Sequence, residues 1–529
     1  MQKTFKDLPS KEIYVASIDI GTNSTHLLIA QINLSLKSFS IKFTEKSTTR
    51  LGERDEEGNL RESSIQKVLD TLKTFKDYCT SYKVTEILAA ATSAVRESPN
   101  GGELIQRIKE DIGFKVELIS GVEEARLIYL GVLSGMALED KSYVIIDIGG
   151  GSTELILANN EDTQALTSSR VGAVRLKNDF FDKSSLSKSR VDFLKTFIKG
   201  SLEPSVTKIR KRLSRNERIA LIATSGTATS LGNLISYELT QSKQKMHGYQ
   251  FTKNDLDKIL EKLINMSESE RRKVPFLSER RAEIIIPGAL ILNTSMEMLG
   301  AEELTLSERS LREGLVVDWM LRRGMLKSKF TIQSNVRRTT VLHQAQKFGV
   351  DESRSETLQN LAMSIYEQTK NILHDDQNNI GKNLLWAACY LFTCGKHINL
   401  SAYHKHSWYL IKNFELLGYS HSEINIIASI ARYHRKTLPK KRHESWQTLN
   451  TREEKKIVLE MSLILRLASA LDKRPDSSIS SIDIQLLDKK LLFRIIPLDL
   501  NKDLLLEKWS LKSCSDVLKE LKDLELEVS

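Results

Sequence analysis

Short apolar runs alternate with turn residues along the first third of the chain, and this pattern predicts an α/β fold. Residues 13–31 have the pattern of two strands around a turn, and residues 38–46 that of a third strand. A helix is predicted over residues 63–79, because apolar residues recur there with a helical period: Ile65, Val68, Leu69, Leu72 and Phe75. The alternation continues with three predicted elements: a strand and turn over 86–97, a strand over 115–120, and a helix from about Val122 to Leu138.

One motif occurs twice in the chain. The segment Asp19–Ala30 (DIGTNSTHLLIA) recurs as Asp147–Ala158 (DIGGGSTELILA), with seven of the twelve positions identical. The copies lie too far apart for a solenoid or propeller repeat. Each copy places an Asp, a Gly and a Ser-Thr pair between two apolar strands. We therefore expect a duplicated domain with a cleft between the two copies.

The second half of the chain has a different pattern. Residues 322–335 are polar and contain few apolar residues, which predicts a linker. From residue 336 to about residue 475 the apolar residues follow a helical period throughout. The segments IDIQLL and LLFRII, separated by DKK, then predict a hairpin. Residues 503–528 predict an amphipathic helix or a short strand.

The composition is that of an ordinary globular protein, apart from its charge. The chain has 529 residues, 40% hydrophobic and 28% charged, and is too long for a single core. We expect no membrane span, because long apolar windows are absent, and no secretory signal, because the N-terminus lacks an apolar region. Four cysteines without a CxxC pair fit a reducing cytoplasm. The net charge of +10 indicates attraction to polyphosphate, nucleic acid or a nucleotide, unless it reflects only a lysine-rich composition.

The repeated motif has the chemistry of a phosphate-binding turn. Glycine has no Cβ, so backbone N–H groups can approach phosphate oxygens closely, and serine and threonine hydroxyls add donors. Asp19 and Asp147 precede the turns, where a carboxylate can hold Mg²⁺. The alternative is a pair of tight hairpins with ordinary Asp–Gly turns. The predicted phosphate-binding residues are Gly21, Thr22, Asn23, Ser24, Gly149, Gly150, Gly151, Ser152 and Thr153.

Further segments accompany the repeat across about the first 320 residues: AATSAVRES (90–98), ISGVEEARLIYLGV (119–132), SGTATSLG (225–232), HGY (247–249), RRAEIIIPGALIL (280–292) and SLREGL (310–315). With these segments the chain resembles the exopolyphosphatase / guanosine pentaphosphate phosphohydrolase family, within the superfamily of actin, sugar kinases and heat-shock ATPases. The resemblance implies two ribonuclease-H-like (actin-like) α/β domains around a cleft, at residues 1–135 and 136–322. It also implies an all-α HD-like domain at 330–475 and a small C-terminal α+β piece at 476–529.

Glu124 is the candidate catalytic carboxylate. Ser120 and Glu123 have the spacing of a capping box, which leaves Glu124 free to project toward the cleft. The helix N-terminus is expected to lower the pKa of Glu124. By resemblance, Glu124 matches the family's catalytic glutamate, which positions or deprotonates the attacking water. The alternative is a glutamate that only interacts favourably with the helix dipole.

The resemblance also assigns residues to phosphate and to metal. Arg96 matches an arginine that contacts phosphate, with a solvated surface arginine as the alternative. The second copy has a glutamate where the first has His26, and the family places that glutamate near the metal. Arg312 is equally compatible with phosphate binding and with a structural ion pair. For Mg²⁺, or alternatively Mn²⁺, the predicted ligands are Asp19, Asp147 and Glu154.

Two basic segments in the helical half, residues 403–413 and 431–443, are candidates for binding a long phosphate chain, with a solvated surface as the alternative. In the resemblance to an HD-type domain, Phe392 and Thr393 replace the metal-binding His-Asp doublet, so we expect this domain to bind no metal. Zinc is not expected, because the clustered histidines lie among lysines and arginines. The candidate ligands of the phosphate chain are His404, Lys405, His406, Arg432, His434, Arg435 and Lys436.

We therefore expect a cytoplasmic, Mg²⁺-dependent exopolyphosphatase that releases terminal orthophosphate from inorganic polyphosphate. The nearest alternative is hydrolysis of guanosine pentaphosphate to the tetraphosphate at the same site. An ATP-dependent kinase is less compatible with the sequence, because Ser225 stands where many superfamily members have a glycine in the adenosine-binding turn. A non-catalytic binder of polyphosphate or nucleic acid is the remaining alternative. The resemblance implies a homodimer, and no specific nucleic-acid partner is expected.

Overall fold

The computed structural model contains two compact units, Met1–Val336 and Arg337–Ser529. It describes residues 13–139, 141–181, 187–214, 217–242, 244–326, 336–474, 478–499 and 503–529. The predicted linker at residues 322–335 lies largely outside the described residues, which stop at 326 and resume at 336. None of the described helices is long and apolar enough to cross a membrane.

The first unit is built on two sheets with the same topology. The first sheet has the strand order β3-β2-β1-β4-β5, with β1 to β3 antiparallel and β4 and β5 parallel to β1. Its strands are β1 (Ile13–Ile20), β2 (Thr25–Asn33), β3 (Ser38–Ser47), β4 (Glu86–Ala91) and β5 (Val116–Leu118). We call the part built on this sheet lobe I.

The second sheet repeats this order as β8-β7-β6-β9-β11 and adds β10 at its edge. Its strands are β6 (Tyr143–Ile148), β7 (Thr153–Ala158), β8 (Thr163–Ser169), β9 (Ala220–Thr224), β10 (Gln250–Thr252) and β11 (Glu303–Leu306). We call this part lobe II. The predicted α/β duplication is therefore confirmed, with the two repeated motifs at equivalent places in the two sheets.

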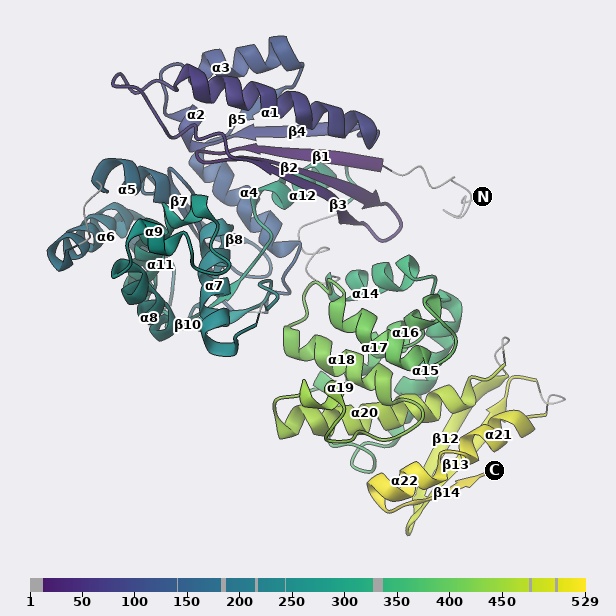
Figure 1. The fold of residues 1–529 in the computed structure, drawn as a ribbon. Helices are drawn as coiled ribbons and strands as arrows, with labels where there is room; N and C mark the ends of the chain where they lie inside the picture. The colour runs from purple at the N-terminus through teal and green to yellow at the C-terminus, as the bar shows by residue number, and fades with distance from the viewer. Residues whose placement is uncertain are drawn as a thin grey trace. The chain divides into compact units, whose positions relative to one another are not determined.

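Helices cover both faces of each sheet (Figure 1). Helices α4 (Gly121–Leu133) and α12 (Leu311–Arg322) share one core with both sheets, in which Leu28 of β2 and Ile156 of β7 are fully buried. The outer face of the first sheet packs against α1 (Glu62–Ser81) and α3 (Gly101–Arg107). The outer face of the second sheet packs against α6 (Lys188–Arg210), α7 (Ser225–Thr240), α8 (Lys253–Ile264) and α11 (Ile285–Leu299).

Helices α4 and α12 approach each other through glycines. A Cβ on Gly131 would overlap the carbonyl oxygen of Ser310, and one on Gly314 would overlap the carbonyl oxygen of Leu127. Helix α4 ends at Leu133 rather than at the predicted Leu138, because the chain turns at Ser134 and Gly135. The close contact fixes the start of α12 against the helix that carries Glu124.

Short elements complete the first unit. The predicted turn after β4 is instead a single helical turn, α2 (Ser93–Arg96), followed later by a π-helical turn at Ile108–Ile112. In lobe II the short helices are α5 (Ala173–Phe180), α9 (Glu268–Arg271) and α10 (Glu279–Ala282).

The second unit is helical and ends in a small sheet, as expected. Its helices are α14 (Val336–Lys347), α15 (Glu352–Gln368), α16 (Ile380–Leu391), a 3₁₀ turn at Cys394–His397, α17 (Tyr403–Asn413), α18 (His421–Tyr433), α19 (Glu444–Gln447) and α20 (Arg452–Leu471). The predicted hairpin is β12 (Ile479–Leu487) and β13 (Lys490–Pro497).

The last segment is more complex than the single element predicted for it. It forms α21 (Leu505–Lys512), α22 (Ser515–Lys522) and β14 (Glu525–Val528), which pairs in parallel with β13. Asp523 adopts a left-handed conformation at the end of α22, with φ of 54°. That turn reverses the chain into the sheet, which an amphipathic pattern alone does not reveal.

Candidate active site

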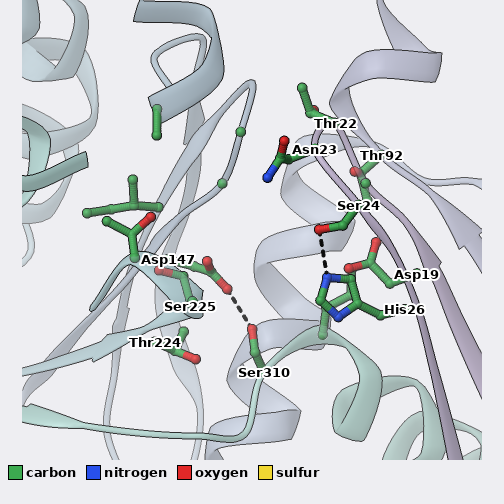
Figure 2. Close-up of a pocket in the computed structure, with 18 of the residues that line it drawn as sticks. Asp19, Thr22, Asn23, Ser24, His26, Thr92, Asp147, Thr224, Ser225 and Ser310 are labelled. Carbon is green, nitrogen blue, oxygen red and sulfur yellow. Dashed lines mark hydrogen bonds between the residues drawn. The ribbon is translucent and has the colours of Figure 1, made fainter. Parts of the chain in front are cut away.

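The two repeated motifs form matching turns on opposite sides of one cleft. Gly21 N–H donates to the carbonyl of Ser24 at 3.2 Å, and Gly149 N–H donates to that of Ser152 at 2.9 Å. Figure 2 shows Asp19, Ser24 and His26 on one side of this cleft and Asp147 on the other. The cleft has a volume of about 500 Å³ and is lined by the turn residues of both lobes.

The successive glycines of the second turn allow it to touch the first. A Cβ on Gly150 would lie 2.8 Å from Thr22 Cβ. A Cβ on Gly151 would lie 2.5 Å from Ser93 Oγ and 3.0 Å from Thr22 Oγ1. Larger residues would separate the two turns, so the glycines allow the turns to lie in contact with each other.

Five described carboxylates line the cleft: the four predicted site residues Asp19, Glu124, Asp147 and Glu154, and also Glu308. Burial raises the pKa of Asp19 to about 7 and that of Asp147 to about 6. Burial and the neighbouring Asp147 raise the pKa of Glu154 to about 8. This clustering of acids favours a divalent cation, whose charge would stabilise their ionised forms.

The expectation of a lowered pKa for Glu124 is wrong. Burial, followed by the nearby charge of Glu154, raises the pKa of Glu124 well above its usual value. Arg96 opposes this effect: its Nη1 lies 3.3 Å from Glu124 Oε2. The helix N-terminus therefore does not dominate, because the carboxylate is enclosed between the lobes. A higher pKa makes Glu124 a better proton acceptor once it is ionised.

The capping box predicted for Ser120 and Glu123 at the start of α4 is only half formed. Ser120 Oγ accepts a hydrogen bond from the N–H of Glu123 at 3.1 Å. The Glu123 carboxylate does not return to Ser120; it binds the guanidinium of Arg126 at 2.7 and 2.8 Å. Arg126 also donates to Asp318 of α12, so Glu123 belongs to the contact between α4 and α12. Glu124 alone of the two glutamates lines the cleft.

Arg96 lies beside Glu124 and is not among the residues that line the cleft. Its Nη1 also donates to the carbonyl of Ile119 at 2.7 Å. The predicted contact of Arg96 with phosphate therefore stays a prediction, whereas its contact with Glu124 is a feature of the structure.

Serine hydroxyls hold two of the carboxylates. Ser310 Oγ donates to Asp147 Oδ2 at 2.5 Å (Figure 2), and Ser168 Oγ donates to Glu154 Oε1 at 2.7 Å. In lobe I, Ser24 Oγ lies 3.0 Å from Nε2 of His26, the counterpart of Glu154. No local sequence pattern indicates a role for Ser168 or Ser310, because each reaches its partner only through the tertiary fold.

Three cations in the cleft come from separate elements: Lys46 of β3, Arg281 of α10 and Arg312 of α12. Burial, with Arg281 nearby, lowers the pKa of Lys46 to about 8. Burial, with Arg312 nearby, lowers the pKa of His26 to about 2, so its ring is neutral. Among the described residues, neither Lys46 nor Arg281 has a carboxylate within ion-pair distance. Arg281 lies in the segment RRAEIIIPGALIL, but the sequence of that segment does not indicate that its side chain lines the cleft.

The turn at Ser225 differs from a simple nucleoside pocket. Ser225 has a φ of 96°, a conformation that favours glycine, and helix α7 starts directly at this residue. The guanidinium of Arg281 lies against Gly226, where any side chain would overlap it. A cation therefore occupies the space beside this turn.

Polar contacts join the lobes across the edge of the cleft. Arg175 of α5 donates to the Gly151 carbonyl at 2.9 Å and to Glu97 of lobe I at 2.5 Å. Arg280 of lobe II donates to Thr48 of lobe I at 2.7 Å. These bonds hold the second turn and the lobe I residues beside it at a fixed separation.

The carboxylate oxygens of the cleft are compatible with binding Mg²⁺. Asp19 Oδ1 is buried and has no hydrogen-bond partner among the described residues. In the part of the chain that the structure covers, no three His, Cys, Asp or Glu side chains form a ready-made metal cage. Mg²⁺ commonly uses one or two carboxylates together with water and substrate phosphates. The carboxylates fit an ion that is held jointly with a substrate.

In the helical unit, the histidines are not all on the surface. His404 and His434 are 6% and 2% exposed, and the His434 ring lies edge-on to Phe392 and accepts or donates a bond to Tyr403. Burial lowers the pKa of His434 to about 3. The expectation that these two rings belong to an exposed basic surface is therefore wrong, because helices α17 and α18 pack on them.

The other basic candidates keep some exposure: Lys405, His406, Arg432, Arg435 and Lys436. Their contact with a phosphate chain stays a prediction. Asp472, at the end of α20, binds Arg354 at 3.0 Å.

Comparison with known proteins finds matches both to family sequence models and to solved structures. The sequence model of the Ppx/GppA phosphatase family matches residues 18–323, and that of Ppx/GppA phosphatase domain III matches residues 336–526. The crystal structure of the Aquifex aeolicus member of the Ppx/GppA family has 29% identity and a TM-score of 0.51, covering 59% of this chain and 99% of that one. An exopolyphosphatase from Cytophaga hutchinsonii has 28% identity and a TM-score of 0.54, covering 59% of this chain and 98% of that one.

Proposed function

The chain belongs to the Ppx/GppA phosphatase family, and from that premise we propose that it is an exopolyphosphatase, which hydrolyses the terminal phosphate of inorganic polyphosphate. The observation that carries the proposal is the position of Arg281. Its guanidinium lies against Gly226, beside the turn that holds adenosine in related folds, and it has no ion-pair partner among the described residues. A partly buried cation without a carboxylate partner in that place favours a phosphate group over an uncharged base.

The remaining cleft residues fit the same substrate. The turn residues of both motifs line the same cleft, and Lys46 and Arg312 add positive charge from lobe I and from α12. Successive phosphates of a linear chain would neutralise these cations in turn. Hydrolysis of a phosphoanhydride depends mainly on such positioning and charge stabilisation.

Glu124 is the residue we assign to the attacking water. The water oxygen attacks the terminal phosphorus in line with the bridging oxygen, and the bridging P–O bond breaks. Glu124 orients the water and accepts its proton, and the chain leaves one phosphate shorter. Arg96 and the Ile119 carbonyl hold the geometry of this glutamate from lobe I.

Asp19, Asp147 and Glu154 are the residues that would hold Mg²⁺ in this cleft, and Mn²⁺ is the alternative ion. When bound, the ion would neutralise charge on the phosphate oxygens and lower the energy of the transition state. We propose cytoplasmic localisation and a homodimer as further expectations.

The test is phosphate release by the purified full-length chain with Mg²⁺, from long-chain polyphosphate and from guanosine pentaphosphate in parallel. Glu124→Gln is the inactive variant, and Glu123→Gln is its matched control, because Glu123 pairs with Arg126 outside the cleft. We expect release from polyphosphate that Glu124→Gln lowers by about a hundredfold or more and Glu123→Gln largely preserves. Equal activity of the two variants would contradict the site assignment.

Guanosine pentaphosphate is the second candidate substrate. Glu308 lines the cleft near the Ser225 turn, and its carboxylate could accept hydrogen bonds from a guanine ring. Phosphate release from the nucleotide alone would support this alternative. Transfer of phosphate from ATP to an alcohol would indicate a kinase, and binding without release would indicate a non-catalytic protein.

A further inference from the structure

Ser310 connects the start of α12 to the carboxylate at the end of β6. Its hydroxyl donates to Asp147 Oδ2 at 2.5 Å, and both residues line the cleft (Figure 2). The two residues are distant in the sequence, so this bond exists only in the folded lobe. With Oδ2 engaged, Oδ1 is the Asp147 oxygen that remains for a ligand.

Three contacts fix the backbone of Ser310. Its N–H donates to Glu313 Oε2 at 2.9 Å, and Glu313 is only 2% exposed. Its carbonyl accepts from the N–H of Gly314 at 3.0 Å and packs on Gly131 of α4, where a Cβ would overlap it. The hydroxyl is therefore presented to Asp147 from a rigid part of the fold, as a supporting residue must be.

Among the described residues, no hydroxyl gives the equivalent carboxylate in lobe I the same support. Asp19 and Asp147 occupy matching positions, since each is paired with the second residue of the following strand, His26 of β2 or Glu154 of β7. Asp19 Oδ1 is buried without a hydrogen-bond partner among the described residues, whereas Asp147 receives Ser310. The duplication is thus asymmetric at its two aspartates.

We propose that Ser310 is a positioning residue, which holds the Asp147 carboxylate in the orientation that binds a divalent cation together with phosphate. This inference rests on the proposed function, because it assigns the cation to the same cleft. Hydrogen-bond partners of metal-binding carboxylates commonly change metal affinity by about 10- to 100-fold when they are removed.

The test measures Mn²⁺ binding to the full-length chain by electron paramagnetic resonance, with inorganic phosphate present and no hydrolysable substrate. The variants are Ser310→Ala, which loses the hydroxyl, and Ser310→Thr, which keeps it. Ser295→Ala is the matched control, because Ser295 is also buried but donates to the Ile291 carbonyl within α11. Thermal unfolding of each variant confirms that it is folded.

We expect Ser310→Ala to weaken Mn²⁺ binding by about tenfold or more, with Ser310→Thr and Ser295→Ala close to the unsubstituted chain. Unchanged affinity in Ser310→Ala overturns the inference, and so does a loss in Ser310→Thr as large as that in Ser310→Ala. Absence of Mn²⁺ binding by the unsubstituted chain also overturns it.

The phosphate-release assay separates this inference from the proposed function. If the unsubstituted chain hydrolyses polyphosphate while Ser310→Ala binds Mn²⁺ normally, only the role of Ser310 fails. If it releases phosphate from neither polyphosphate nor guanosine pentaphosphate, the proposed function fails whatever the Mn²⁺ result.

Discussion

The Arg96 guanidinium lies 3.3 Å from the Glu124 carboxylate, where the short helix α2 meets the N-terminus of α4. Arg96 also donates to the Ile119 carbonyl, just before α4 begins. The contact joins two segments of lobe I and sets the orientation of the residue to which we assign the attacking water. The positive charge of Arg96 also opposes the rise in the pKa of Glu124.

Replacing Arg96 with alanine should therefore lower kcat by about tenfold or more and move the acidic limb of the pH–rate profile to higher pH. Burial and Glu154 already raise the pKa of Glu124, and the loss of the cation raises it further. A full pH–rate profile of phosphate release measures both effects. Arg107→Ala is the control, since Arg107 pairs with Glu62 away from the cleft. A lower kcat with an unshifted profile would contradict the proposed coupling.

Gly151→Ala should impair phosphate binding by separating the two turns. The new Cβ would lie 2.5 Å from Ser93 Oγ and 3.0 Å from Thr22 Oγ1, closer than carbon and oxygen normally approach. We expect kcat/KM to fall by about tenfold or more. Gly200→Ala in α6 is the matched control, because no atom lies within 4 Å of its Cβ position. That control should stabilise the chain by about 0.5–1 kcal/mol and leave kcat/KM unchanged.

In the absence of divalent metal, the first unit should lose stability as pH rises from about 4 to about 7. The pKa of Asp19 is 3.8 in an exposed peptide and about 7 in the folded cleft, so over this range the unfolded chain gives up a proton that the folded chain keeps. Proton release then favours the unfolded state. Asp19→Asn removes the contribution of Asp19 to this loss, and we expect it to raise the Tm by about 2 °C or more near pH 8 in EDTA.

Well below pH 4 both states carry the Asp19 proton, so the two proteins should differ much less there. Thermal unfolding at both pH values provides the measurement. A stabilisation by Asp19→Asn that is independent of pH would show that the charge of Asp19 is not the cause.

Exposed and buried basic residues of the helical unit should behave differently on substitution. Reversing the charges of Lys405, Arg435 and Lys436 should weaken binding of long-chain polyphosphate and reduce its dependence on salt, with little effect on the Tm. His434→Ala should instead lower the Tm, because the ring is buried against Phe392 and contacts Tyr403. Binding at several salt concentrations, together with thermal unfolding, distinguishes the two outcomes.

If His434→Ala alone weakens polyphosphate binding while the unfolding temperature stays constant, the ring contacts the ligand directly, and the burial argument fails. If the charge reversals leave the affinity unchanged, these residues form a solvated surface only.

The sequence by itself determined the features that depend on neighbouring residues. Alternating apolar residues and glycine turns identify the duplicated strands, and the two Asp-Gly motifs identify the turns that carry Asp19 and Asp147 into the cleft. The position of Glu124 follows from the start of one helix. These features were predictable because the strand period, turn chemistry and helix start are local properties.

Only the tertiary structure decided which distant residues join the cleft, how far pKa values shift and which side chains are buried. Lys46, Arg281 and Ser310 reach the cleft from β3, α10 and the start of α12, and nothing in their local sequence indicates that they meet. The pKa of Glu124 rises because two lobes enclose it, although its own helix favours the opposite shift. His434 is buried because the helical unit packs around it, with Phe392 and Tyr403 against its ring. Burial and long-range electrostatic effects depend on the atoms that packing brings close, and the order of residues along the chain does not specify those distances.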